Sequence, residues 1–285
     1  DNESPRFADI TGDGKPELIF HTGGRLGYAR PGADLTQPWS FFPISGKEGW
    51  GRYQHGLGFG DVNGDKKPDF LMVNGWWEQP AGKEPGDPAG VTTWKKHAVR
   101  LGTRGGSHMY TYDVDGDGDM DIIASLDAHN YGLAWMEQIR KNGEITFNRH
   151  EIMGSKPEHN AYGVKFSQMH SVCLVDMDGD GLKDIITGKR FWAHGPKGDS
   201  EPGAPAVLYW FKLVRSKKDG VHYIPYQIDD DSGVGTQFTV GDLTGDGNPD
   251  VVTGNKKGGY VFIQEVKKVS EDEWRKAQPK RLNNR

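Results

Sequence analysis

Residues 113–121 read Asp-Val-Asp-Gly-Asp-Gly-Asp-Met-Asp, with carboxylates at positions 1, 3, 5 and 9 of the nine-residue stretch. Glycines at its fourth and sixth positions permit the tight, partly left-handed backbone that wraps an ion. Without a cation, so many neighbouring carboxylates would repel one another. The stretch therefore predicts a loop that binds a hard cation, most simply Ca²⁺, through oxygen ligands.

The chain on either side of this loop favours strands. It reads Met-Tyr-Thr-Tyr before the loop and Ile-Ile-Ala after it, which is typical of short strands rather than helices. The opening of the loop also matches an EF-hand, but the twelfth position is Ala124, where an EF-hand carries a bidentate Glu. We therefore expect a strand, a calcium loop and a second strand.

The nine-residue pattern occurs five times, and its first residues are separated by 52, 52, 63 and 66 positions. We call these stretches Asp-rich loops 1 to 5. A metal-free Asp-Gly turn is the alternative interpretation of each. The sixth position is Gly in every loop except at Lys66, so we expect loop 2 to be the most strained or the weakest. The expected calcium ligands, at positions 1, 3, 5 and 9, are Asp9, Thr11, Asp13 and Glu17; Asp61, Asn63, Asp65 and Asp69; Asp113, Asp115, Asp117 and Asp121; Asp176, Asp178, Asp180 and Asp184; and Asp242, Thr244, Asp246 and Asp250.

A repeat of about fifty residues made only of strands predicts an all-β fold, a β-propeller with one four-stranded blade per repeat. Strands are expected at 108–112, 120–125, 132–138 and 146–153 in the third repeat, and at 170–175, 183–188, 207–213 and 221–228 in the fourth. We assign residues 1–266 to the propeller. Residues 267–285 form a C-terminal tail, in which Ser270 begins a short helix as its N-cap.

The five loops resemble FG-GAP or VCBS repeats, the calcium-loop blades of integrin-alpha-type β-propellers, over about residues 1–265. The resemblance implies a fold but no single function, because such propellers serve as adhesion modules, lectins and lyases. The first repeat starts with one strand and the last lacks a fourth strand. We therefore expect the five blades to belong to a larger ring of about seven, with further blades or domains upstream.

Charge and hydropathy limit the partners. The loops hold 18 of the 40 acidic residues, so the rest of the chain has 22 acidic against 35 basic residues, and metal-filled loops would leave a basic surface. A carbohydrate ligand, anionic or polyhydroxylated, fits this surface, whereas nothing specific indicates nucleic acid. No apolar run approaches the ~20 residues of a membrane helix. Calcium loops favour a calcium-rich, secreted or periplasmic location.

Histidines mark a second metal site. The Asp-rich loop joins the first two strands of a blade, so the segments that lead into the first strands surround the axis on the opposite face. His55 and His170 stand six residues before their loops, as does Glu3, and His108 stands five before. We predict that His55, His108 and His170 bind one transition metal, most simply Zn²⁺ with an open position. The register of His108 requires a bulge, because strand faces alternate. The alternative is that each His hydrogen-bonds a neighbouring blade.

Other polar residues are expected on the same face. His129, His194 and Arg190 lie between second and third strands, and Tyr162 lies in the segment leading into the fourth blade. They are candidate catalytic residues, with solvated loop positions as the alternative. A calcium-loop propeller with axial histidines is similar, more weakly, to the propeller domain of aldos-2-ulose dehydratase, which implies zinc and lyase chemistry on keto-sugars. Propeller polysaccharide lyases, which use His and Tyr on uronic acids, are a parallel resemblance.

These patterns favour a carbohydrate lyase or dehydratase. The metal would acidify a C–H beside a sugar carbonyl or carboxylate, and His129, His194 or Tyr162 would remove the proton in a β-elimination. The alternative is a non-catalytic propeller that binds carbohydrate or protein. A binding module needs calcium alone, whereas the lyase also needs the transition metal.

Overall fold

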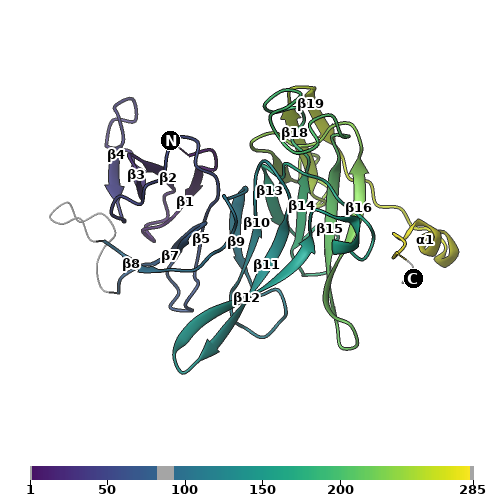
Figure 1. Cartoon of the computed structure of the whole chain (residues 1–285), viewed down its shortest axis with the longest axis horizontal. Coiled ribbons are helices and arrows are strands. Elements are labelled where there is room, and N and C mark those ends of the chain that lie inside the picture. Colours follow the sequence, from purple (N-terminus) through teal and green to yellow (C-terminus); the bar gives the residue numbers. More distant parts are fainter. Residues whose placement is uncertain (1, 82–92, 283–285) are drawn as a thin grey trace.

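A computed structural model of the chain describes residues 2–81 and 93–282, in which antiparallel sheets follow one another in chain order (Figure 1). Each Asp-rich loop joins the first and second strands of a sheet, as the repeat predicted. The all-β propeller architecture is therefore confirmed.

The strands group into five blades. Blade 1 has β1 (Arg6–Ala8), β2 (Glu17–Thr22), β3 (Arg25–Arg30) and β4 (Ser40–Pro43). Blade 2 has β5 (Leu57–Gly60), β6 (Asp69–Met72), β7 (Gly75–Glu78) and β8 (Lys95–His97). Blade 3 has β9 (His108–Tyr112), β10 (Asp121–Ser125), β11 (Leu133–Lys141) and β12 (Glu144–Met153). Blade 4 has β13 (Val172–Val175), β14 (Asp184–Gly188), β15 (Leu208–Ser216) and β16 (Gly220–Asp229). Blade 5 has β17 (Thr239–Gly241), β18 (Asp250–Asn255) and β19 (Gly258–Phe262).

Blades 2 and 3 share one sheet. Their first strands, β5 and β9, pair in parallel with Leu57 opposite His108, which joins the two blades into eight strands. The other blades stay separate sheets, and blade 5 has three strands within the described residues. Blade 3 therefore has a fixed register relative to blade 2.

Apolar side chains fill the spaces between blades. One cluster packs Ile123 and Trp135 of blade 3 against Ile185 and Phe211 of blade 4, and a similar cluster joins blades 1 and 2. Trp76, Trp77 and Trp135 of the third strands are buried in this packing. Trp76 stacks on His97 with ring centroids 3.9 Å apart, and Trp135 stacks on His150 at 4.3 Å. These aromatic residues therefore serve blade packing.

The ninth residue of each loop holds its blade together. Asp121 is buried, and its Oδ2 accepts the N–H of Val114 in the loop at 2.8 Å while its Oδ1 accepts the N–H of Gln138 in β11 at 2.8 Å. The equivalent Asp69, Asp184 and Asp250 accept the same two hydrogen bonds in their blades. One carboxylate thus ties together the loop, the second strand and the third strand.

Loop 2 carries backbone strain at its sixth position. Lys66 has φ 69°, in the left-handed region, where loop 3 has Gly118 with φ 94°. A side chain with a Cβ costs roughly 1–2 kcal/mol in this conformation. The expected strain of loop 2 is therefore present in the backbone.

The described part of the tail contains one short helix. α1 (Glu271–Ala277) begins after Ser270, whose side chain forms a capping box with Glu273, in agreement with the predicted N-cap. A short 3₁₀ helix, η1 (Pro157–His159), follows β12. Within residues 2–81 and 93–282, no helix is long and apolar enough to cross a membrane.

Replacement of Asp121 by Ala should destabilise the protein by about 2–5 kcal/mol, because two backbone N–H groups then lose their acceptor. Urea unfolding in excess chelator measures this without a contribution from calcium. Asp117→Ala is the matched control: its exposed carboxylate accepts the N–H of Asp119, and its loss should cost less than about 1 kcal/mol. Equal losses for the two variants would contradict the structural role of Asp121.

Candidate metal centre

Three histidines from three blades meet on the face opposite the Asp-rich loops. His55 lies before β5, His170 lies before β13, and His129 lies in the loop between β10 and β11. We call these residues the histidine cluster. Their Nε2 atoms converge: His55 Nε2 lies 3.0 Å from His129 Nε2 and 3.0 Å from His170 Nε2. A ligand atom from each ring therefore reaches one small volume.

Glu3 adds a carboxylate to this volume. Its Oε2 lies 3.0 Å from His170 Nε2 and 3.7 Å from His55 Nε2. Glu3 is held there because its backbone N–H bonds to the carbonyl of Gln54. Ligands at ~2.0–2.1 Å in a tetrahedral site lie about 3.3–3.4 Å apart, close to the separations in the cluster.

Hydrogen bonds on the far side of two rings fix their tautomers. His55 Nδ1 lies 2.5 Å from the carbonyl of Tyr53, and His129 Nδ1 lies 2.9 Å from Asp199 Oδ1. Both partners only accept, so the Nδ1 atoms carry the hydrogens and the Nε2 atoms carry lone pairs. Such outer partners are typical of metal-ligating histidines.

Neutral histidine rings carry too few hydrogens to turn every close contact in the cluster into a hydrogen bond. A neutral His170 has one Nε2 hydrogen to offer Glu3 or His55, and none remains between the lone pairs of His55 and His129. Burial, followed by the nearby charge of His170, lowers the pKa of His55 to about 4, and burial also lowers the pKa of His170. The imidazoles of His55 and His170 are therefore neutral at pH 7, and a metal cation fits the site better than added protons.

Strained backbone positions two of the rings. Tyr53 has φ 65° and Gln168 has φ 62°, although neither is glycine, and each stands two residues before a cluster histidine. The left-handed turn aims the carbonyl of Tyr53 at His55, and the carbonyl of Gln168 accepts the N–H of His170 at 2.8 Å. Strain of this kind is found at functional sites, where the surrounding structure maintains it.

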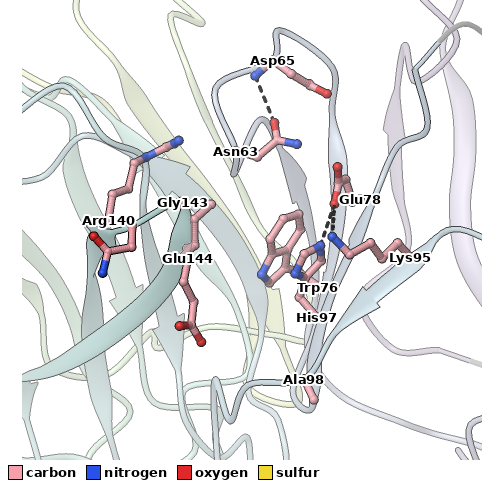
Figure 2. Close-up of a pocket in the computed structure, with 12 residues that line it drawn as sticks. Asn63, Asp65, Trp76, Glu78, Lys95, His97, Ala98, Arg140, Gly143 and Glu144 are labelled. Carbon is pink, nitrogen blue, oxygen red and sulfur yellow. Dashed lines mark hydrogen bonds and ion pairs between the residues drawn. The ribbon is translucent and has the colours of Figure 1, made fainter.

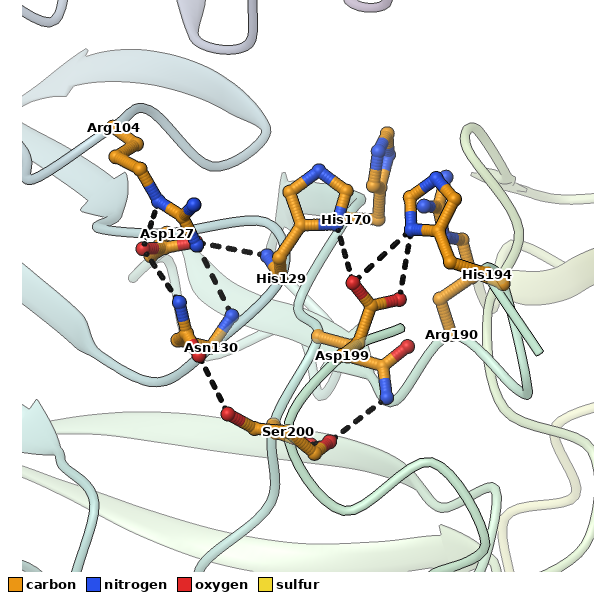
Figure 3. A network of polar contacts seen from close by, with 12 residues as sticks. Arg104, Asp127, His129, Asn130, His170, Arg190, His194, Asp199 and Ser200 are labelled. Carbon is orange, nitrogen blue, oxygen red and sulfur yellow. Dashed lines mark hydrogen bonds and ion pairs between the residues drawn. The ribbon is translucent and has the colours of Figure 1, made fainter. Parts of the chain in front are cut away.

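A polar network supports the remaining ring (Figure 3). Asp127 accepts the backbone N–H of His129 at 2.9 Å and the Nε–H of Arg104 at 3.0 Å. Asp199 accepts from His129 and also from His194, whose Nδ1 lies 3.0 Å from Oδ2. Burial opposes ionisation of Asp199, but the hydrogen bonds from the two histidines outweigh it and lower its pKa. His194 and Asp199 thus form a dyad beside the cluster.

The opposite charges of Glu3 and Arg190 lie close together beside the cluster. Arg190 is buried, and its Nη1 lies 3.7 Å from Glu3 Oε2. The hydrogen bond from His170 lowers the pKa of Glu3 to about 2, although burial opposes this shift. Glu3 is therefore ionised and offers a negative ligand.

The structure does not bring His108 and Tyr162 into the cluster, so these two placements are corrected. His108 is the first residue of β9, where pairing with β5 sets it opposite Leu57, two residues beyond His55, and its ring bonds to the carbonyl of Pro5. Tyr162 instead lies against Arg281 of the tail, which approaches its ring to 5.7 Å. His129, His194 and Arg190 do lie in or beside the cluster.

Sequence reasoning did not select Glu3 and Asp199 as site residues. Glu3 shares the six-residue offset of His55 and His170, so the signal was present but was applied to histidines alone. Asp199 lies in the long connection between β14 and β15, where no periodic pattern indicates which side chains point inward.

Two segments of the chain match repeat families. Residues 113–187 match the FG-GAP-like repeat, and residues 234–263 match the FG-GAP repeat. These segments contain loops 3, 4 and 5, the strands on both sides of loops 4 and 5 and the strand that follows loop 3. The fold is an FG-GAP-type β-propeller.

Solved structures resemble the chain at low sequence identity. A lectin of Agrocybe aegerita that recognises non-reducing terminal N-acetylglucosamine is 17% identical, with a TM-score of 0.50 over 90% of this chain and 62% of the lectin. The Tc holotoxin pore of Photorhabdus luminescens is 15% identical, with a TM-score of 0.42 over 90% of this chain and 11% of that chain. This propeller thus spans under two thirds of either chain. No curated protein matches the sequence.

Elemental analysis of protein never exposed to chelator should find about one transition-metal ion per chain. His129→Ala should remove it, because one of three imidazole ligands is lost. His108→Gln is the matched control and should retain the ion. Loading should fall as the pH falls from about 6 towards 4, because neutral imidazole binds metal and protonated imidazole does not. Loss of the ion in His108→Gln but not in His129→Ala would contradict this assignment.

Proposed function

We propose that the protein is a carbohydrate lyase whose reaction centre is a divalent metal, most simply Zn²⁺, held by His55, His129 and His170. The convergence of three Nε2 atoms, two of them fixed as lone-pair carriers, is the observation that supports this function. Such an ion polarises a sugar carbonyl or carboxylate and acidifies the adjacent C–H. The other residues bind the sugar and move the proton.

His194 is the residue best suited to move that proton. Its side chain is 52% exposed, so a ligand can reach the ring, and Asp199 accepts its Nδ1–H. Nε2 then carries the lone pair and can accept a proton from carbon, while Asp199 stabilises the resulting imidazolium. This arrangement requires no movement of the cluster.

An acidic sugar is the substrate class favoured by the surroundings. A cavity of about 290 Å³ adjoins the cluster and is lined by Arg190, His194, Asn255 and Lys256 among others. Its cations would attract a carboxylate, and its backbone groups would bind hydroxyls. Uronic acid units combine these two features.

A binding propeller without catalysis is the second candidate. Glu3 lies within reach of the same volume, so it would complete four-coordination and close the centre as in structural metal sites. The N-acetylglucosamine lectin with a similar fold is compatible with carbohydrate binding. In either case we propose calcium in the Asp-rich loops, and a secreted or periplasmic location where calcium is abundant.

The proposal is tested by incubating the metal-loaded protein with a panel of uronic-acid polysaccharides and keto-sugars. Elimination creates a conjugated double bond, whose ultraviolet absorbance measures the rate. His194→Ala should lower kcat by about 10²–10⁴-fold while metal content stays the same. Asp199→Asn should lower both kcat and metal affinity, because Asp199 also orients the metal ligand His129. His159→Ala is the matched control, because His159 pairs with Glu151 outside the cluster. It should leave the rate unchanged.

The outcome also separates the two candidates. Calorimetric binding of a sugar to the metal-loaded protein, without double-bond formation from any panel member, would contradict the lyase and support the binding propeller. Retention of full activity by His194→Ala would contradict the role of the dyad.

A further inference from the structure

The residue that faces the ninth loop position across the sheet differs in kind among the blades. It is the third-strand residue opposite the ninth loop position. The register of the second and third strands places it one residue beyond the paired residues that lie nearest the loop. From blade 1 to blade 5 it is Arg30, Glu78, Glu137, Lys212 and Ile263. Two blades thus carry a cation at this position, two carry an acid and one carries an apolar side chain.

In blade 1 the cation occupies the loop. Arg30 Nη2 lies 3.3 Å from Thr11 Oγ1 and 3.3 Å from Asp13 Oδ2. Its Nε lies 3.4 Å from Glu17 Oε1. The guanidinium therefore contacts the third, fifth and ninth positions, which are oxygen donors that a calcium ion would need.

Blade 4 repeats the arrangement with lysine. Lys212 Nζ lies 2.7 Å from Asp180 Oδ2 and also contacts Asp178 Oδ2. These are the fifth and third positions of loop 4. Lys212 Nζ donates hydrogen bonds to both carboxylates. The ammonium group is therefore held as a charged partner of the loop.

In blades 2 and 3 the facing residue has the opposite charge. Glu137 bonds to His150 at 2.7 Å, and its charge contributes to a raised pKa of Asp115, for which burial is the main cause. Glu78 bonds to His97 at 2.7 Å in a groove that Asn63 and Asp65 of loop 2 also line (Figure 2). In both blades the facing residue is therefore an acid, and the basic side chains nearby come from other positions. Lys95 pairs with Glu78, Arg140 pairs with Asp119 of loop 3, and Arg215 Nη2 lies 3.8 Å from Asp113 Oδ1.

The two kinds of cation compete for the same atoms. A carboxylate oxygen that already pairs with an ammonium or guanidinium group must give up that contact before it ligates Ca²⁺. The displaced side chain would also keep its positive charge within a few ångströms of the ion, which is repulsive. A loop that contains its own cation should therefore bind calcium much more weakly.

We infer that Arg30 and Lys212 replace calcium in loops 1 and 4, so that the ion binds only in the loops whose facing residue is not basic. The inference rests on the proposed calcium role of the loops and refines it. The five repeats are then of two types: loops 1 and 4 are closed by a side chain, and loops 2, 3 and 5 are open to metal.

Calorimetric titration of chelator-treated protein with Ca²⁺ tests the inference by counting bound ions. Lys212→Glu gives blade 4 the residue of blades 2 and 3, and it should raise the count by about one. Glu137→Lys is the reverse exchange in blade 3 and should lower the count by about one. Lys218→Glu, an exposed change of the same charge in the β15–β16 turn, is the matched control and should leave the count unchanged.

Thermal unfolding tests the same inference in variants that fold too poorly for calorimetric titration. Lys212→Met leaves the acids of loop 4 without a counter-charge, so its Tm should fall in chelator and recover in excess calcium. An unchanged ion count in Lys212→Glu, or a wild-type protein that fills loops 1 and 4 as tightly as loop 3, would overturn the inference and leave the calcium role intact. Absence of calcium binding in every variant would overturn both.

Discussion

The carboxylate at the ninth position of each loop is the contact on which the blades depend. In four blades its two oxygens accept one N–H from the loop and one from the third strand. The acid that the pattern indicates as an ion ligand is thus also a structural centre of its blade. Burial raises the pKa of Asp69 to about 7 and those of Asp121 and Asp184 to about 6, because it disfavours the charged form. A nearby cation, whether a bound ion or a basic side chain, therefore stabilises both the ionised carboxylate and the blade.

The two ends of each blade have different tasks because they carry different chain connections. The Asp-rich loop closes the first hairpin, and the opposite end receives the segment leading into the first strand together with the connection between the second and third strands. His55 and His170 belong to the first kind of segment, and His129 belongs to the second. The histidine cluster is a result of this alternation: side chains far apart in the chain meet because every blade presents the same end to the centre.

The fold could be predicted from the sequence because a nine-residue pattern, flanked by short strand-like stretches, repeats at a period typical of propeller blades. The face of His55, His129, His170 and His194 followed from connectivity, without knowledge of any side-chain position. The register of individual strands did not follow. His108 stands one residue from the offset of His55, and it pairs with Leu57, two residues beyond His55, outside the histidine cluster. Asp199 lies in an irregular connection, where packing rather than periodicity determines which side chains point inward.

The parallel pairing of β5 with β9 has a consequence for how the proposed metal would bind and leave. His55 and His129 both belong to the eight-stranded sheet, whereas His170 belongs to the sheet of blade 4 and Glu3 to the segment before β1. An arriving ion would meet two imidazoles already held in one rigid body, and the other two ligands would close on it from separate sheets. The bound ion would then fasten three sheets to one another. Its dissociation rate would report on the relative motion of blade 4 and the central sheet more than on the strength of any single metal–ligand bond.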